Sequence, residues 1–382
     1  MKSLYSRFLS ASPGRLHFAA HSHHLWPDVT RDAQLEAWDD AARLADLKWD
    51  RVFGEVTNEA QGHIATTLDL PAPEQIAFAP NTHEFVVRLL SCFPPAQRLK
   101  VLTTDSEFMS FSRQIARLEE ENLIDVVRIP TEPFATFASR FIEAARKQPH
   151  DLVFFSQVFF NSGFVVRDLE AIVAATPSSA MVVVDGYHGF FAIPTSLKRI
   201  ADRIFFTAGG YKYAQSGEGV CFLSVPRGFD RRPLNTGWFA GFGSLESGEF
   251  SRVSFSNDGF RFMGATFDPV GLYRFNAVAR MLKAKGLTID SIDVHVKTLQ
   301  QLFLDRITAK TNAAISAKDL IAPADGVLGL GHFLSFRRDD AQAIADRLAA
   351  KNVIVDHRGD RLRIGFGLYQ DAADVEALVA HL

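Results

Sequence analysis

Hydrophobic and polar positions follow two different rhythms in the first part of this chain. Between about residues 75 and 225, short runs that are apolar throughout alternate with amphipathic runs. A short run that is apolar at every position is typical of a strand buried on both faces, and apolar positions spaced by three or four are typical of a helix. The predicted strands are 100–103, 124–129, 152–156, 181–184, 203–207 and 220–225, and the predicted helices between the early ones are 109–120, 134–147 and 167–175. Strands separated by helices predict an α/β domain with a mostly parallel sheet.

The flanking regions have other patterns. Residues 28–49 have helical spacing, and residues 226–267 are rich in Gly, Ser, Phe and Arg with weak periodicity, which in a compact protein usually marks a functional segment. Further helical runs are expected at 85–92, 270–285, 289–309, 339–351 and from 371 onward, with strands near 332–337, 353–356 and 361–366. We therefore expect an N-terminal segment (1–50) beside a small domain, a large α/β domain (51–267) and a small C-terminal α+β domain (268–382).

Composition narrows the class of protein. Among 382 residues, 41 Lys and Arg stand against 44 Asp and Glu, and the net charge is −3. This balance excludes a generally basic nucleic-acid binder and gives no reason to expect a membrane partner. Two cysteines cannot build a disulfide framework or a Cys-rich zinc site. Because we see no signal-peptide pattern and no apolar run of about 18 residues, we expect a cytoplasmic enzyme.

The densest group of chemistry-bearing residues follows two predicted strands. Asp185 ends one apolar run, and Lys212 lies 27 residues later in a loop rich in Gly and Tyr. In open α/β sheets, ligands bind at the carboxyl ends of strands. A carboxylate there with a nearby lysine suits pyridoxal 5'-phosphate (PLP), because the lysine forms a Schiff base with its aldehyde and the acid pairs with its pyridinium nitrogen. The alternative is a turn-capping Asp and a solvated Lys.

Motifs around these two residues resemble those of a known family. Tyr211-Lys212-Tyr213, followed by Ser216-Gly217-x-Gly219, resembles the cofactor-lysine segment of kynureninases, which belong to the class V aminotransferase group of PLP enzymes, and Asp185-x-x-His188 matches the same group. The resemblance implies the fold-type I architecture, with a mostly parallel mixed sheet of seven strands in the large domain and a small α+β domain. It also implies a homodimer with the active site between subunits. Lys212, Asp185, His188 and Tyr211 then form the catalytic group, with Tyr211 reaching the cofactor phosphate.

The resemblance assigns further cofactor contacts. Asn81 and Thr82, at the start of an expected helix, match the region that holds the cofactor phosphate, although a plain helix N-cap is the alternative. Phe108 matches the aromatic residue that stacks on the pyridine ring. Kynureninases carry an Asp three residues further on, where this chain has Phe111. Trp238 and Thr266 match segments that reach the phosphate, in part across the dimer interface.

Four residues are candidates for the substrate pocket. Arg363, on the last predicted strand, matches the arginine that binds the substrate α-carboxylate, for which a planar guanidinium is suited. Asn161 matches a turn beside the cofactor, and a simple turn explains it equally well. His21 and Ser22 lie in His21-Ser22-His23-His24, where the family has a pocket segment of different sequence. A metal site is the less favoured reading of these histidines because no Asp, Glu or Cys is placed to complete it.

These features leave the reaction open between two choices. Kynureninase-like hydrolysis of a Cβ–Cγ bond is favoured by the Tyr-Lys-Tyr segment, whereas transamination stays open because the family's Asp is absent. Cysteine desulfuration is disfavoured, since Cys92 and Cys221 fall in a predicted helix and a predicted strand. A protein without catalytic activity that kept the fold is the remaining alternative. Some of the 34 Phe residues fall in buried strands, and others, including Phe239 and Phe242, gather where the resemblance puts the active site. The second group predicts an aromatic or bulky apolar substrate.

Overall fold

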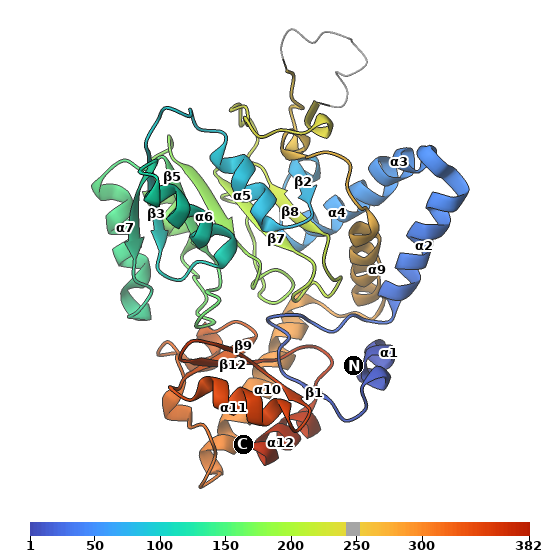
Figure 1. The fold of residues 1–382 in the computed structure, drawn as a ribbon, viewed down its shortest axis with the longest axis vertical. Helices are drawn as coiled ribbons and strands as arrows, with labels where there is room; N and C mark the ends of the chain where they lie inside the picture. Colours follow the sequence, from blue (N-terminus) through green and yellow to red (C-terminus); the bar gives the residue numbers. More distant parts are fainter. Residues whose placement is uncertain (242–252) are drawn as a thin grey trace.

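A seven-stranded mixed sheet forms the centre of the larger part of the molecule (Figure 1). The computed structural model describes residues 1–241 and 253–382. The strand order is β2-β8-β7-β6-β5-β3-β4; the pairs from β7 to β4 are parallel, and β8 is antiparallel to both neighbours. The strands are β2 (Ile76–Ala79), β3 (Leu99–Thr104), β4 (Ile124–Ile129), β5 (Leu152–Ser156), β6 (Met181–Asp185), β7 (Ile204–Gly209) and β8 (Cys221–Ser224). The expected α/β class and the mostly parallel sheet of seven strands are confirmed.

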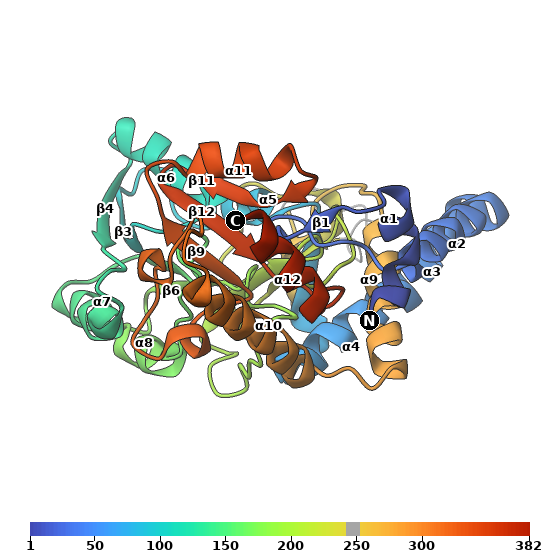
Figure 2. The same ribbon diagram turned by 90° about the horizontal axis from the view of Figure 1, so that it is seen from below.

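Helices cover both faces of this sheet. Seen from below, α5 and α6 lie on one face and α7 and α8 on the other (Figure 2). The helices are α1 (Ser6–Ala11), α2 (Val29–Leu44), α3 (Lys48–Arg51), α4 (Thr57–Leu68), α5 (Thr82–Leu90), α6 (Met109–Glu120), α7 (Phe137–Lys147), α8 (Leu169–Ala175), α9 (Val270–Ala284), α10 (Ile289–Ala309), α11 (Ala341–Ala349) and α12 (Ala372–His381). Because both faces are covered, the central strands are buried at every position, as in β5 and β6, which are apolar except for the last residue of each.

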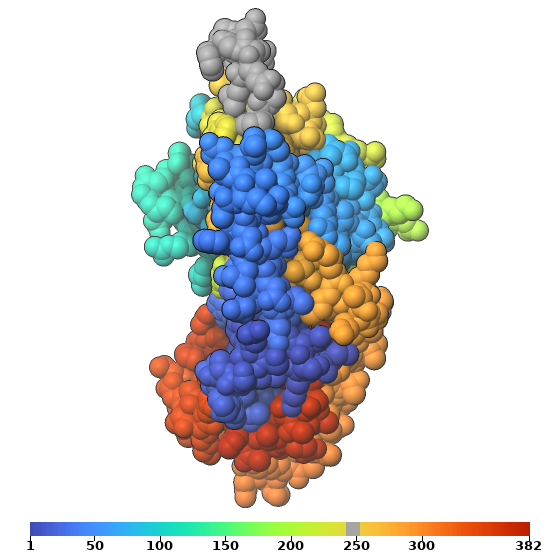
Figure 3. Space-filling model, turned by 90° about the vertical axis from the view of Figure 1, so that its right-hand side faces the viewer, coloured from blue at the N-terminus to red at the C-terminus, as the bar shows by residue number. Residues whose placement is uncertain are grey.

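The smaller part has its own sheet. The strands β11 (Asp356–Arg358), β12 (Arg361–Gly365) and β9 (Phe333–Arg337) are antiparallel, and Figure 2 shows α10, α11 and α12 around them. A separate pair joins β1 (Leu16–His17) to β10 (Val353–Ile354) in parallel. This part of the N-terminal segment therefore lies against the small domain, as Figure 3 shows for the dark blue residues above the red ones. Ala33 and Ala37 of α2 belong instead to the core around the large sheet.

Buried hydrophobic side chains form two cores. The larger surrounds the seven-stranded sheet and includes Leu272 and Phe275 of α9, while the smaller includes Phe303 of α10 and Leu362 of β12. Because α9 belongs to the larger core, we propose that the domain boundary expected at residue 268 lies near the start of α10.

Several element boundaries differ from the sequence predictions. The helix expected over residues 85–92 is α5, which begins at Thr82 because the Asn81 side chain caps it, accepting the N–H of Glu84 at 3.2 Å. The strand expected over 353–356 is divided between β10 and β11, which belong to different sheets. Within residues 1–241 and 253–382, we find no helix with the length and apolar character needed to cross a membrane.

Candidate active site

Asp185 lies at the carboxyl end of β6, in the middle of the large sheet. Its neighbours in register are Ser156 of β5 and Thr207 of β7. Only 8% of Asp185 is exposed, and its Oδ1 atom accepts the N–H of Tyr187 at 2.9 Å. Burial raises the pKa of Asp185, while the Tyr187 N–H and the charge of Lys212 oppose this shift. The structure therefore presents a buried carboxylate at the sheet edge where ligands of this fold class bind.

A tightly held loop between β7 and β8 carries Lys212. Gly210 donates to the Val220 carbonyl at 2.8 Å, and the Arg274 Nε atom donates to the Ser216 carbonyl at 2.7 Å. Gly217 has a φ angle of +73°, and a Cβ atom there would lie 2.3 Å from the Trp26 ring. Both the backbone conformation and the close ring therefore require glycine at this position.

The amine of Lys212 is buried beside His188 and aromatic rings. Its Nζ atom lies 2.9 Å from His188 Nε2 and 5.0 Å from the ring centroids of both Phe108 and Tyr187. Burial lowers the pKa of Lys212 to about 7, although the Asp185 charge opposes the shift. Burial, followed by the Lys212 charge, also lowers the pKa of His188. A lysine amine that is substantially neutral near pH 7 can act as a nucleophile or a base.

Arg363 of β12 lies in a group that reaches toward Lys212 from the small domain. Its Nη2 atom pairs with Asp356, which is its register partner on β11, and its Nη1 atom donates to the Phe160 carbonyl at 2.6 Å. His21 stacks on Phe333 with ring centroids 4.7 Å apart, and its Nε2 atom lies 3.6 Å from Asp356 Oδ2. The rings of Phe160 and Phe333 are each 5.9 Å from Arg363 Cζ. The Phe333 ring also lies 5.5 Å from the ring of His188, the neighbour of Lys212, so the two groups belong to one site.

The proposed phosphate end involves α5 and Tyr211. Thr82 is buried in the first turn of α5, and its hydroxyl lies 3.5 Å from the Cys221 thiol. Tyr211 stacks on His23, with ring centroids 5.1 Å apart, and its ring centroid lies 5.8 Å from Lys212 Nζ. Burial raises the pKa of Tyr211, so its hydroxyl stays protonated. Thr82 and Tyr211 are therefore available as neutral donors to an anion.

Asn161 and Ser22 have partners of their own. Asn161 donates from Nδ2 to the Ser106 hydroxyl at 2.8 Å, and its Oδ1 atom is buried without a hydrogen-bond partner. The Ser22 hydroxyl lies 3.4 Å from His23 Nδ1. Within the two described ranges, no three His, Cys, Asp or Glu side chains come together as metal ligands.

Trp238 and Thr266 lie on the surface of this subunit. Trp238 is 44% exposed and stacks on Phe239 at 4.0 Å, and Thr266 is exposed. Thr266 lines a cavity of about 320 Å³ together with Glu84 and Arg88 of α5. Their role as cofactor contacts stays a prediction. Phe242 lies outside the described residues.

Four residues of the site were not singled out from the sequence. Tyr187 lies within the Asp185-x-x-His188 motif, and its ring packs on Gly209, where a Cβ atom would come within 2.1 Å of its hydroxyl. Glu107 precedes Phe108, and its carboxyl accepts hydrogen bonds from the hydroxyls of Thr104 and Ser156, each at 2.6 Å. Asp356 and Phe333 join the site through strand pairing. The motif could have indicated Tyr187, whereas the other positions depend on tertiary contacts.

These side chains fit PLP. Lys212 has no carboxylate within ion-pair distance among the described residues, so its amine is free for the aldehyde. Asp185 can face the pyridine nitrogen, and Phe108 offers a ring face near Lys212. The orphaned Oδ1 atom of Asn161 is a further polar group without a protein partner. Lys212, Asp185, Phe108 and Asn161 could therefore hold the cofactor, and their roles stay predictions.

Comparisons with known proteins identify the family. A family model described as aminotransferase class-V matches residues 41–378. A variant of the protein C-DES with glycine covalently linked to its PLP cofactor shares the fold at a TM-score of 0.82, with 17% identity over 100% of this chain and 98% of that one. A cysteine desulfurase from Thermococcus onnurineus NA1 gives a TM-score of 0.77, with 16% identity over 96% and 93% of the two chains. C-DES in complex with its product cysteine persulfide, described as a cystine C–S lyase, gives a TM-score of 0.79, with 16% identity over 97% and 98%.

The structural neighbours support the fold, and the family match supports the chemistry. A comparison with curated protein sequences finds no match. The family model covers most of the chain, including Asp185, Lys212 and Arg363. This chain therefore belongs to the aminotransferase class-V family and is a fold-type I, PLP-dependent enzyme that acts on amino acids.

Proposed function

We propose that this enzyme cleaves the Cβ–Cγ bond of an aromatic or bulky amino acid by kynureninase-like hydrolysis. The observation that carries this proposal is the aromatic wall between the two polar ends of the site. Phe108 lies beside Lys212, and Phe160 and Phe333 lie beside Arg363. Aromatic side chains provide a large apolar contact area with favourable edge and face geometries for a ring. A substrate held by its amine and its carboxylate would therefore place its side chain among these rings.

The residues divide the work of such a reaction. When bound, PLP supplies an aldehyde that bonds to an amine and a ring that withdraws electrons from the substrate α-carbon. Asp185 holds a proton at the ring nitrogen, and Lys212 accepts the α-proton, for which a pKa of about 7 is suitable. Arg363 binds the α-carboxylate, His188 orients Lys212, and Tyr211 donates to the phosphate. The surrounding Phe side chains exclude water from the Lys212 amine.

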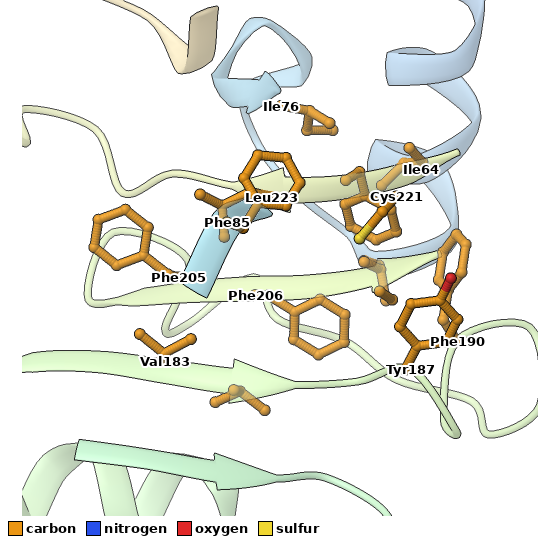
Figure 4. Close-up of a cluster of buried hydrophobic side chains, with 14 of the residues drawn as sticks. Ile64, Ile76, Phe85, Val183, Tyr187, Phe190, Phe205, Phe206, Cys221 and Leu223 are labelled. Atoms are coloured by element: carbon orange, nitrogen blue, oxygen red, sulfur yellow. The ribbon is translucent and has the colours of Figure 1, made fainter. Parts of the chain in front are cut away.

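Desulfuration through a protein thiolate finds little support in the site. The chain has two cysteines, and both are buried. Figure 4 shows Cys221 on β8 among buried hydrophobic side chains. Burial raises the pKa of each thiol to about 12, so neither is a reactive thiolate near pH 7.

A second candidate is elimination of a sulfur group from the β-carbon of an amino acid. It is favoured by the same buried cysteines, because elimination needs no protein thiol, and by the fold shared with C-DES, which is described as a cystine C–S lyase. Transamination uses the same Lys212 and Arg363 and is the third candidate.

One set of assays separates these reactions. The PLP-loaded enzyme is incubated with L-kynurenine, with L-cystine, and with L-phenylalanine plus an oxo acid. We expect L-kynurenine to yield alanine and an aromatic acid, and Lys212→Ala to abolish this reaction. If L-cystine is the only substrate that reacts and it yields pyruvate, the result supports elimination. If the only reaction is amine transfer to the oxo acid, the result supports transamination. A protein that binds no PLP, and so shows no yellow colour or borohydride bleaching, would overturn all three reactions.

A further inference from the structure

Arg363 is already occupied by groups of the protein. Asp356 takes its Nη2 atom and the Phe160 carbonyl takes its Nη1 atom, while Nε is buried without a hydrogen-bond partner. A carboxylate that binds arginine through two parallel hydrogen bonds needs two free donor atoms. Each Nη atom carries two N–H groups, so one donor on each stays open, but a substrate carboxylate bound there would lie beside Asp356. Two carboxylates on one guanidinium repel each other, which favours the departure of Asp356.

His21 is an alternative hydrogen-bond partner for Asp356. The side chain is fully buried, and neither ring nitrogen has a hydrogen-bond partner. The Nε2 atom is 3.6 Å from Asp356 Oδ2, so a small movement would form a direct hydrogen bond. The imidazole is held between Phe333 and Gly365, where an added Cβ atom would lie 2.2 Å from Nδ1. A buried polar group without partners is costly, which favours a state in which His21 is paired.

Charge balance gives His21 a second role. The groups that face it are Asp356, Arg363 and Lys212, with His188 next to Lys212. Arg358 contacts the other oxygen of Asp356 at 3.3 Å. A substrate carboxylate adds one negative charge to this buried group, and an unbalanced buried charge is unfavourable. His21 is the neutral side chain in contact with Asp356 that can take up the balancing proton.

We propose that the substrate carboxylate displaces Asp356 from Arg363, and that Asp356 then pairs with His21, which takes up one proton from solvent. No covalent bond changes: the Arg363–Asp356 pair breaks, an Arg363–substrate pair forms, and a proton is added to His21. The proposal rests on the proposed function, because it takes Arg363 as the carboxylate site. Asp356 thereby becomes a positioning residue that makes substrate binding depend on pH.

The electrostatics of the unliganded site agree with this exchange. Burial, followed by the Arg363 charge, lowers the pKa of His21 to about 3, so it is neutral near pH 7. Although burial favours the neutral acid, His21 and Arg363 hold the pKa of Asp356 well below its ordinary value. A bound carboxylate would neutralise Arg363 and release Asp356 toward His21, and both changes raise the pKa of His21.

The test measures proton uptake during binding. The probe is 3-phenylpropionate, which has a carboxylate and a ring but no amine that could react with the cofactor. Calorimetric titration of the PLP-loaded enzyme in two buffers of different ionisation enthalpy gives the number of protons taken up. We expect about one proton per probe in the pH range where His21 is neutral before binding and charged after it, and in that range binding should weaken about tenfold per pH unit. Above the pKa of the liganded His21, both the proton uptake and the pH dependence should disappear. The uncharged analogue 3-phenylpropanamide should take up none.

Two conservative variants test the two partners of the exchange. His21→Gln should take up almost no proton and bind the probe with an affinity that is independent of pH. Asp356→Asn should bind the probe more tightly than the wild type, because the competing carboxylate is gone, and should also take up no proton. His381→Gln and Asp340→Asn, both at exposed positions, are the matched controls and should behave as wild type. Thermal melting of each variant confirms that it is folded.

The outcomes separate this proposal from the proposed function. Unchanged proton uptake in His21→Gln, or weaker binding in Asp356→Asn, would overturn the exchange even if amino-acid cleavage is observed. An enzyme that cleaves L-kynurenine but binds the probe without proton uptake fails only here. An enzyme that shows the exchange and leaves L-kynurenine unchanged contradicts only the proposed reaction.

Discussion

Glu107 is a second buried carboxyl group close to Asp185, and its protonation matters for the stability of the site. Burial raises its pKa from 4.5 to about 7, against hydrogen bonds from Ser156 and Thr104, and the nearby Asp185 charge adds to the increase. Ser156 is also the β5 residue that pairs with Asp185 in the sheet. Glu107 is therefore linked to the cofactor carboxylate through one strand.

The raised pKa predicts that Glu107 makes the enzyme less stable at higher pH. The folded protein binds more protons than the unfolded chain between about pH 4.5 and 7, so the free energy of unfolding falls as pH rises through this window. The full effect is on the order of 3 kcal/mol. Glu107→Gln should remove it, so the decrease in melting temperature from pH 5 to pH 8 should be smaller than in wild type. Glu143→Gln, at an exposed position on α7, is the control, and an equal decrease in all three proteins would contradict the prediction.

If Arg363 binds the substrate carboxylate, replacing it by lysine should weaken substrate binding. A lysine keeps the charge but not the planar fork, so Arg363→Lys should lower kcat/KM for L-kynurenine by roughly a hundredfold, or about 3 kcal/mol. Arg337→Lys is a matched control on the same sheet, because Arg337 is 51% exposed. Steady-state kinetics of both variants check this. Similar losses in the two variants would remove Arg363 from the carboxylate site.

At the scale of elements, the sequence pattern predicts the helices and strands whose formation depends on neighbouring residues. The helices over 109–120 and 289–309 were predicted with the bounds of α6 and α10, because their apolar faces repeat regularly. The strands β1 and β2 were not predicted, since they are two and four residues long and depend on distant partners. The same limit applies in the site. Asp185 and Lys212 lie in sequence motifs, whereas Asp356 reaches Arg363 only through the pairing of β11 with β12.

The close packing of the loop between β7 and β8 predicts that alanine is more destabilising at one glycine than at another. Gly217 and Gly228 have nearly the same φ angle, +73° and +74°, but an added Cβ atom would lie 2.3 Å from Trp26 at Gly217 and would meet nothing within 4 Å at Gly228. Gly217→Ala should therefore be more destabilising than Gly228→Ala by about 1–3 kcal/mol, because both pay the same backbone cost and only one has the clash. Urea unfolding gives the difference. Gly217→Ala should also bind PLP more weakly because this loop carries Lys212, and equal stability of the two variants would argue against the clash.

At the scale of the whole molecule, the exposure of two predicted cofactor contacts, Trp238 and Thr266, indicates that the active site of one subunit is incomplete. Lys212, Asp185 and Arg363 are buried together, while Trp238 and Thr266 lie on the surface beside the cavity near α5. In the resemblance on which Trp238 and Thr266 were assigned, cofactor contacts come partly from the partner subunit. A two-fold dimer would bring the same surface of each subunit to the other. We therefore propose that Thr266 completes the active site of a second copy.

Mixing two defective variants tests this arrangement directly. Lys212→Ala removes the cofactor lysine, and Thr266→Ala should weaken cofactor binding. If Thr266 acts across the interface, a mixed dimer has one site with both defects and one site with neither. Random reassortment of equal amounts should then restore about a quarter of wild-type activity, since half of the dimers are mixed and each has one intact site. If Thr266 acted within its own subunit, each site of a mixed dimer would carry one defect and no activity would return. Light scattering before and after mixing establishes that dimers are present and exchange, and a monomer with full activity would contradict the prediction.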